Sequence, residues 1–174
     1  EAAELLKTFK VRNVIISAYD NYNIIFNTNI IEGRAGLVIK DKDIKIEILS
    51  PSKDYYNSNN NSLVFIFSYN DTNILYTGDI EFEAESDLLY FFFKEQKRNI
   101  DILKVAHHGS NTSSYLELIK EINSKIAIIS VGINNNYNMP NENVINNLIS
   151  LGTKVYRTDL DGTILYYNNE IILL

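Results

Sequence analysis

The sequence contains no cysteine and no tryptophan, and it has only two histidines, two prolines and one methionine. Without cysteine, disulfides, thiolate zinc sites, iron–sulfur clusters and cysteine nucleophiles are excluded. No apolar run approaches the roughly 20 residues that a membrane-spanning helix needs, and we recognise no signal peptide.

Positive charge is also scarce, since 16 lysines and arginines against 22 acidic residues give a formal net charge of −6. This balance argues against broad electrostatic capture of nucleic acid or of an anionic membrane, while a local phosphate site stays open. The hydrophobic content of 45% and the charged content of 22% are those of a globular protein, and 174 residues suit one domain. Asparagine clusters at 57–61 and 134–136 are interpreted as loops.

The first half of the sequence predicts one helix followed by strands. The helix, over 2–9, precedes a polar, glycine-containing stretch over 18–36 that predicts a loop with little regular structure. Over 44–49, isoleucine alternates with Lys45 and Glu47, which is the period of a half-buried strand. Further strands are expected at 11–17, 37–40, 63–69 and 74–76, with turns at 41–43 and 70–73.

Helices and strands alternate in the second half. A helix over 81–96 opens with three glutamates, which suit the positive end of a helix dipole. Further helices are expected at 113–122 and 141–151, and strands at 100–106, 126–131, 154–157, 162–167 and 170–174. This alternation predicts an α/β architecture, in which helices pack on a sheet and loops gather at the strand ends.

The first candidate for chemistry is Asp79, which follows Gly78 at the end of the strand at 74–76. In one interpretation it caps the helix that opens at Glu81. In the other its carboxylate bridges metal ions. The position of Asp79, taken alone, favours the capping role.

The second candidate is the pair His107 and His108, the only histidines, which follow a buried strand. Neighbouring side chains diverge, so at most one of them binds a given metal ion. Ser110, Thr112 and Ser113 then precede a helix whose free N–H groups suit an oxyanion or phosphate. The alternative is a plain N-cap at Thr112 or Ser113 beside unrelated histidines, and the residues alone leave both interpretations open.

A third stretch contains Arg157, Asp159 and Asp161. Its pattern favours a solvated hairpin, although a guanidinium also suits a phosphate or carboxylate clamp. Taken together, Asp79 and His107 from separate strand ends suit Zn²⁺ or Mn²⁺ in a hydrolytic site. A catalytic metal ion takes three or more protein ligands, and the sequence supplies no clear third one.

These motifs resemble, in order, the metallo-β-lactamase-fold domain of ComEC-type competence proteins. They lie at 75–80, 101–113, 129–132 and 155–159 within a matching stretch over 61–165. The resemblance implies the αββα sandwich of that family with a dinuclear metal site, here as one partial domain over 1–174 that is truncated at its N-terminal side. The family's His-x-His-x-Asp-His motif precedes a helix like the one at 2–9, and this sequence lacks it.

The resemblance also assigns roles to residues. Asp79 matches the family's bridging aspartate and His107 its late histidine ligand, with His108 as the second candidate. Ser110 lies where substrate contacts are expected, so the implied catalytic set is Asp79, His107, His108 and Ser110. Two Zn²⁺ or Mn²⁺ ions are implied for the full-length parent, and weak or no metal binding for this fragment. Met139 stands where the family has histidine, and a thioether does not replace an imidazole as proton carrier.

The function implied is a metal-dependent hydrolase, a phosphodiesterase or nuclease linked to DNA uptake. The parent would be tethered to the membrane with this domain on its outer face. The alternative is a degenerate fold that is kept for binding or scaffolding. Met139 and the absence of the His-x-His-x-Asp-His motif favour this alternative for the fragment, which we expect to be inactive. A β-lactam-degrading enzyme fits less well, because the motifs are of the competence type. We also expect a homodimer through an exposed sheet edge.

Overall fold

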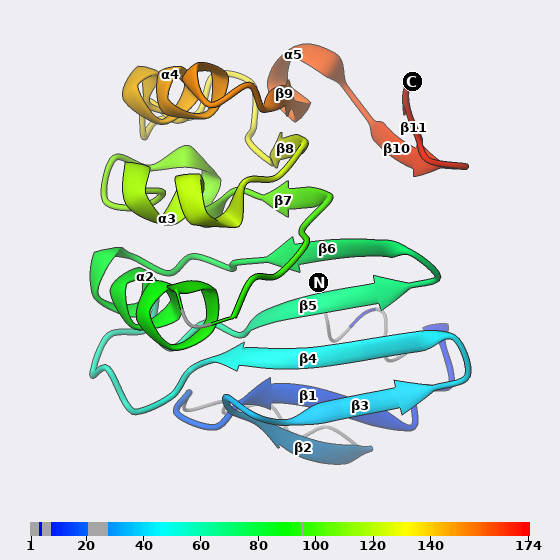
Figure 1. Cartoon of the computed structure of the whole chain (residues 1–174). Coiled ribbons are helices and arrows are strands. Elements are labelled where there is room, and N and C mark those ends of the chain that lie inside the picture. Colours follow the sequence, from blue (N-terminus) through cyan, green and yellow to red (C-terminus); the bar gives the residue numbers. More distant parts are fainter. Residues whose placement is uncertain (1–3, 5–7, 21–27, 95) are drawn as a thin grey trace.

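The computed structural model describes residues 4, 8–20, 28–94 and 96–174 (Figure 1). The helix predicted over 2–9 lies largely outside these residues. In the described part of the chain, no helix has the length and apolar character needed to cross a membrane.

The structure is built on a seven-stranded sheet in the order β3-β4-β5-β6-β7-β8-β9. Its first half is an antiparallel meander and its second half, from β6 onward, is parallel. The strands are β3 (Val38–Asp41), β4 (Ile44–Ser50), β5 (Val64–Tyr69), β6 (Thr72–Tyr76), β7 (Ile102–Lys104), β8 (Ile126–Ile129) and β9 (Lys154–Arg157). The predicted turn at 70–73 is tighter than expected, since β6 already begins at Thr72 and Asn70 takes up a φ of 49°.

Helices cover one face of the parallel half, where Figure 1 shows α2, α3 and α4 in a row. They are α2 (Phe82–Leu88), α3 (Leu116–Ile122) and α4 (Glu142–Ser150). Leu75, Leu103 and Ala127, one from each central strand, join one buried cluster with helix residues such as Ile119 and Leu148. This packing confirms the predicted α/β architecture.

The helix predicted over 81–96 changes character after α2. Residues Leu89–Lys94 form a π-helical segment, η1. The wider turn places Leu89 and Phe93 in the core and leaves Tyr90 and Phe91 exposed. The prediction of one continuous α-helix over 81–96 was therefore wrong in its second half, where the helix has π geometry.

The loop predicted over 18–36 was wrong in part, because it contains β2 (Asn29–Gly33). This strand pairs in parallel with β1 (Asn13–Ser17) in a separate two-stranded sheet. Glycine ends β2 because a Cβ at Gly33 would lie 2.6 Å from Cδ2 of Leu63 and 3.0 Å from Cγ2 of Ile15. Tertiary packing therefore determines that this segment forms a strand, and the local composition alone did not predict it.

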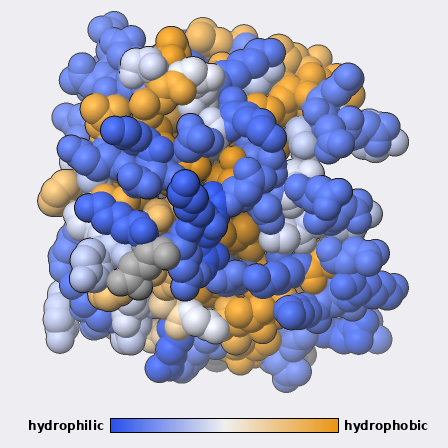
Figure 2. Space-filling view, viewed as in Figure 1, coloured by the Kyte–Doolittle hydropathy of each residue, from blue (hydrophilic) through white to orange (hydrophobic). Residues whose placement is uncertain are grey.

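The sheet face opposite the helices is partly open. The C-terminal hairpin, β10 (Ile164–Tyr167) with β11 (Glu170–Leu173), forms another two-stranded sheet. Residues of β10 line a groove of about 1210 Å³ whose floor includes Ile74, Ile102 and Ile128. Figure 2 shows its mouth as a notch in the right-hand outline, between the C-terminal hairpin above and the β5–β6 hairpin below.

Candidate active site

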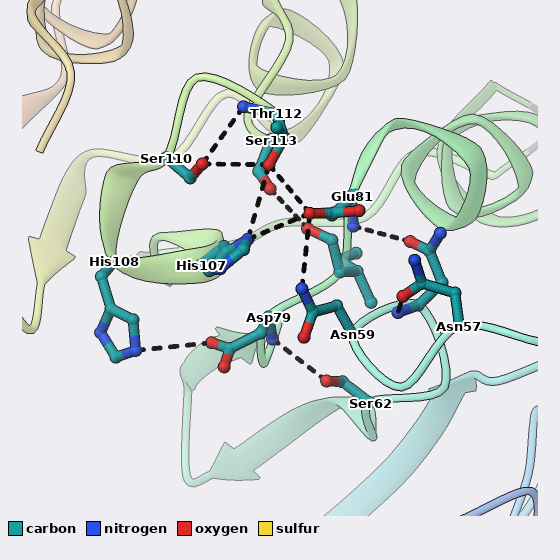
Figure 3. Close-up of polar contacts among 12 residues, drawn as sticks. Asn57, Asn59, Ser62, Asp79, Glu81, His107, His108, Ser110, Thr112 and Ser113 are labelled. Atoms are coloured by element: carbon teal, nitrogen blue, oxygen red, sulfur yellow. Dashed lines mark hydrogen bonds and ion pairs between the residues drawn. The ribbon is translucent and has the colours of Figure 1, made fainter. Parts of the chain in front are cut away.

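The two motif segments meet at one edge of the sheet. β6 and β7 are parallel neighbours, so their carboxyl ends lie side by side. The chain leaves β6 through Gly78 and Asp79, and it leaves β7 through the short 3₁₀ helix η2 (Ala106–Gly109). The backbone N–H of His107 donates to the carbonyl oxygen of Gly78 at 3.0 Å. The sheet thus brings Asp79, His107 and His108 together, as Figure 3 shows.

Unusual backbone conformations aim these side chains. His107 and His108 both have left-handed dihedral angles, with φ of 47° and 53°. Such a conformation costs a non-glycine residue about 1–2 kcal/mol. Gly78 also has a positive φ, and a Cβ there would lie 2.7 Å from Cβ of Ser62. The histidine rings point apart, with their centroids 6.5 Å from each other, as expected for neighbours in sequence.

Asp79 is close to His108. The distance from Oδ1 of Asp79 to Nε2 of His108 is 3.7 Å. Nδ1 of His108 lies 2.6 Å from the carbonyl oxygen of Ser130, which can only accept, so Nδ1 is the nitrogen that donates. In the neutral ring, Nε2 then carries a lone pair and faces a carboxylate oxygen. Two electron-pair donors facing one point suit a bound cation, and metal-ligating histidines usually donate their other N–H in this way.

His107 faces a different carboxylate. Its Nδ1 lies 3.4 Å from Oε1 of Glu81 and 3.5 Å from Oγ1 of Thr112. Among the described contacts, none joins His107 directly to the side chain of Asp79. The predicted pairing of Asp79 with His107 over one ion therefore stays a prediction, and His108 is the histidine that the structure places beside Asp79.

Glu81 joins the segments of the site, and our sequence analysis missed it. Its Oε1 accepts hydrogen bonds from Oγ1 of Thr112 at 3.1 Å and from Nδ2 of Asn59 at 3.4 Å (Figure 3). We had interpreted Glu81 only as a favourable charge at the start of a helix. It is the N-cap residue of α2, but its side chain makes no capping hydrogen bond. Its position two residues after Asp79 was the available signal.

Ser110 belongs to the same hydroxyl network. Its Oγ lies 3.0 Å from Oγ1 of Thr112 and accepts the backbone N–H of Thr112 at 3.3 Å. Ser110 is buried, and Thr112 connects it to His107 and Glu81. Its predicted contact with substrate is a role that the structure leaves to be tested.

The asparagine cluster that we interpreted as a loop also supports the acidic segment. Oδ1 of Asn60 accepts the backbone N–H of Glu81 at 2.7 Å, and Oγ of Ser62 accepts the backbone N–H of Asp79 at 3.2 Å. Asn60 and Asn61 are buried. The cluster is a loop, as predicted, but its side chains hold the carboxylates at the sheet edge in place.

The helix predicted from Ser113 starts later than expected and the alternative of an N-cap at Thr112 or Ser113 was wrong, while the oxyanion interpretation stays a prediction. The helix α3 begins later, at Leu116, and neither Thr112 nor Ser113 caps it. The backbone N–H groups of Ser114 and Tyr115 donate to the carboxyl group of Glu85 at 2.6 and 3.3 Å. Glu85 is only 1% exposed, and burial raises its pKa to about 7. A carboxyl group of the chain itself thus binds the two backbone N–H groups that directly precede α3.

Arg157 is engaged within its own turn. Its guanidinium forms two hydrogen bonds to the carboxylate of Asp159, at 3.0 and 2.6 Å, and this ion pair raises the pKa of Arg157. Residues Thr158–Asp161 form the short helix α5 in place of the predicted hairpin turn. The clamp interpretation of Arg157 therefore has no support in the structure.

Met139 lies in a loop that packs against the histidine segment. The side chain of Asn135 binds both backbone groups of Met139, at 3.0 Å to the N–H and 2.7 Å to the carbonyl oxygen. Pro140 leaves no room for a side chain at Gly109, where a Cβ would lie 2.6 Å from Cβ of Pro140. The loop therefore meets η2 through Pro140 and through the backbone N–H of Asn141, which donates to the carbonyl oxygen of Gly109 at 2.8 Å.

The described residues do not complete a metal centre. Within them, no group of three or more histidine, aspartate or glutamate side chains is placed to hold an ion. The Asp79–His108 pair offers two donor atoms, whereas a catalytic ion takes three or more ligands from the protein. The chemistry of this pair suits a cation, but the number of donors falls short.

Comparisons with known proteins place this arrangement in context. Residues 1–133 match the family model of the metallo-beta-lactamase superfamily. The chain is 38% identical over 142 residues to ComE operon protein 3 of Bacillus subtilis, which covers 80% of this chain and 18% of that protein. It is 28% identical over 164 residues to Recombination protein 2 of Haemophilus influenzae, and the match covers 94% of this chain and 20% of that protein. It is 31% identical over 122 residues to Competence protein ComA of Neisseria gonorrhoeae, and the match covers 70% of this chain and 17% of that protein.

The chain thus spans about one-fifth of the length of these relatives. The similarities confirm the resemblance to ComEC-type competence proteins and the fold class predicted from the motifs.

Proposed function

Because this chain belongs to the metallo-beta-lactamase superfamily, we propose that it is part of a metal-dependent phosphodiesterase that cleaves DNA during uptake. The names of the relatives, among them a competence protein and a recombination protein, support the link to DNA. Superfamily membership supports the use of a divalent metal ion. Zn²⁺ or Mn²⁺ is our proposal from the histidine and carboxylate donors.

One observation supports the proposal most directly. Nε2 of His108 faces Oδ1 of Asp79 at 3.7 Å, while the other ring nitrogen is held by the carbonyl oxygen of Ser130. Metal-ligating histidines have this arrangement, with one ring N–H donated to a carbonyl oxygen and the other nitrogen directed at the ion beside a carboxylate. The described residues supply only these two donors, so we derive no reaction step through the ion.

His107 is suited to hold a proton. Oε1 of Glu81 lies 3.4 Å from its Nδ1, which favours the tautomer with the proton on Nδ1 and leaves Nε2 as an acceptor. Thr112 donates to the same Glu81 oxygen and keeps the carboxylate in place. We assign His107 the role of general acid or base, with Glu81 as the residue that positions it.

The test is hydrolysis of single-stranded DNA and of bis(p-nitrophenyl) phosphate by the full-length protein in the presence of Mn²⁺. We expect Asp79→Asn and His108→Gln to lower the rate by 100-fold or more, as loss of a metal ligand exceeds the 10–100-fold effect of outer-shell changes. Asp71→Asn, in the exposed turn between β5 and β6, is the matched control and is expected to be neutral. Unchanged hydrolysis by Asp79→Asn refutes the proposal.

A second candidate is a non-catalytic module that keeps the fold for binding or scaffolding. The observation in its favour is the short supply of metal donors in the described part of the chain, together with Met139 at the position where the family has histidine. In that case the full-length protein binds DNA or a partner, and the wild type and Asp79→Asn show the same absence of hydrolysis.

A further inference from the structure

A cavity adjoins the candidate active site on its helical side. It has a volume of about 600 Å³ and lies among the start of α2, the segment over 111–115 and the first turns of α4. That volume is in the range of small-molecule pockets. Glu81 and Thr112 line the cavity and also contact His107 (Figure 3). The cavity and the candidate active site are therefore direct neighbours, and one ligand can occupy both.

The charge of the cavity disfavours a phosphate group as its occupant. No lysine or arginine lines it, whereas the carboxylates of Glu81 and Glu83 do. Glu83 is paired with Lys53 at 3.2 Å, whereas no lysine or arginine pairs with Glu81 among the described residues, so Glu81 is the carboxylate that repels a phosphodiester. The cavity is therefore suited to an uncharged part of a substrate whose phosphate lies elsewhere.

One wall of the cavity is aromatic. The rings of Phe82 and Tyr115 contact each other with centroids 5.1 Å apart and a 59° angle between their planes. Phe82 is 62% exposed, although it stands at the first turn of a helix that packs on the core. An aromatic ring that stays exposed at the mouth of a cavity offers a surface for a flat ligand.

The other wall carries carboxamide groups. Asn143 and Asn147 are four residues apart on α4, so their side chains share one face of that helix, and Asn111 completes the rim. Among the described residues, the side chains of these three asparagines make no hydrogen bond. Each presents a donor and an acceptor in one plane.

From these features we infer that the cavity binds a nucleobase of the DNA strand, adjacent to the phosphodiester at Asp79 and His108. A nucleobase is flat, uncharged and aromatic, and its edge carries paired donors and acceptors that match a carboxamide. Stacking on aromatic side chains tolerates all four bases. This inference rests on the proposed function, since it names the part of the substrate that lies next to the scissile bond.

The test measures binding without metal or hydrolysis. Fluorescence anisotropy in EDTA at low salt compares two labelled strands of equal length, an oligothymidylate and a strand of abasic tetrahydrofuran residues. The phosphates are the same, so the difference reports the bases. We expect the oligothymidylate to bind the full chain at least about fivefold more tightly, the lower end of what one stacked base contributes.

Matched variants locate the effect. Phe82→Ala and Asn143→Ala with Asn147→Ala are expected to remove the preference for bases. Phe91→Ala, an exposed aromatic residue away from the cavity, and Asn146→Ala, on the same helix but not lining it, are expected to keep it.

Each outcome decides the inference. Equal binding of both strands, or no binding of the oligothymidylate, overturns it. A preference that survives Phe82→Ala and the Asn143→Ala, Asn147→Ala variant overturns it as well. A preference that these variants remove supports it, even if the full-length protein hydrolyses no DNA, so its failure is distinguishable from failure of the proposed function.

Discussion

The buried carboxyl group of Glu85 makes the stability of the protein depend on pH. Glu85 is 1% exposed and accepts the backbone N–H groups of Ser114 and Tyr115. These hydrogen bonds favour the charged form, but burial is the larger effect and raises the pKa from 4.5 to about 7. We expect Glu85→Gln to change how stability varies with pH.

The direction follows from proton uptake. Between the unfolded pKa near 4.5 and the folded pKa near 7, the folded protein holds a proton on Glu85 that the unfolded chain has released. The contribution of Glu85 is therefore fully present below pH 4.5 and is lost as the pH rises to 7. A shift of this size corresponds to about 3 kcal/mol in the free energy of unfolding. Glutamine does not titrate, so the variant lacks this loss.

Urea unfolding followed by circular dichroism at pH 5 and pH 8 measures the effect. Glutamine loses one acceptor for the two N–H groups, which lowers the stability of the variant by a pH-independent amount. Relative to wild type, the variant should therefore gain about 2.5 kcal/mol between pH 5 and pH 8, since a smaller part of the effect lies below pH 5. Glu83→Gln, exposed on the same helix, is the matched control and should show no such gain. A difference between Glu85→Gln and wild type that is constant with pH, or that changes in the opposite direction, refutes the reasoning.

Two further predictions concern metal binding and association. Isothermal titration of the 174-residue chain with Mn²⁺ or Zn²⁺ should give weak binding or none, because Asp79 and His108 supply only two donors. Tight binding of two ions per chain would contradict this expectation. Light scattering at high concentration should show a dimer, since β3 ends the seven-stranded sheet and Val38 on it is 44% exposed. Val38→Lys should return the chain to a monomer, and a wild type that stays monomeric would disprove the association.

The order of the elements could be predicted from the sequence wherever periodicity and turns agree. Alternation in β4 and the Asn70–Asp71 turn gave the meander, and the strands and helices from 100 onward gave the parallel half. We did not predict β2, because its position depends on the packing of Gly33 against Leu63 and Ile15, which are distant in sequence. Local pattern carries no information on such contacts.

The candidate site also has features that the sequence predicted and features that it did not. Asp79, His107 and His108 could be found because each follows a strand directly, and parallel neighbours place such residues at one edge. The pairing of carboxylates with histidines could not, since it depends on the left-handed conformations of His107 and His108. The roles of Asn60 and Glu85 were also hidden, because a side chain that accepts a distant backbone N–H looks like any other polar residue in sequence.

The strain at the two histidines bears on the choice between a hydrolase and a degenerate module. Two consecutive non-glycine residues in the left-handed region cost about 1–2 kcal/mol each, and asparagine or glycine at either position would lower that cost. A module kept only for its fold gains stability from such replacements. The chain instead carries its only two histidines at these positions, with one ring anchored on the carbonyl oxygen of Ser130 and the other beside Glu81. Strain of this kind persists where the direction of a side chain matters, which favours a site that still uses both imidazoles.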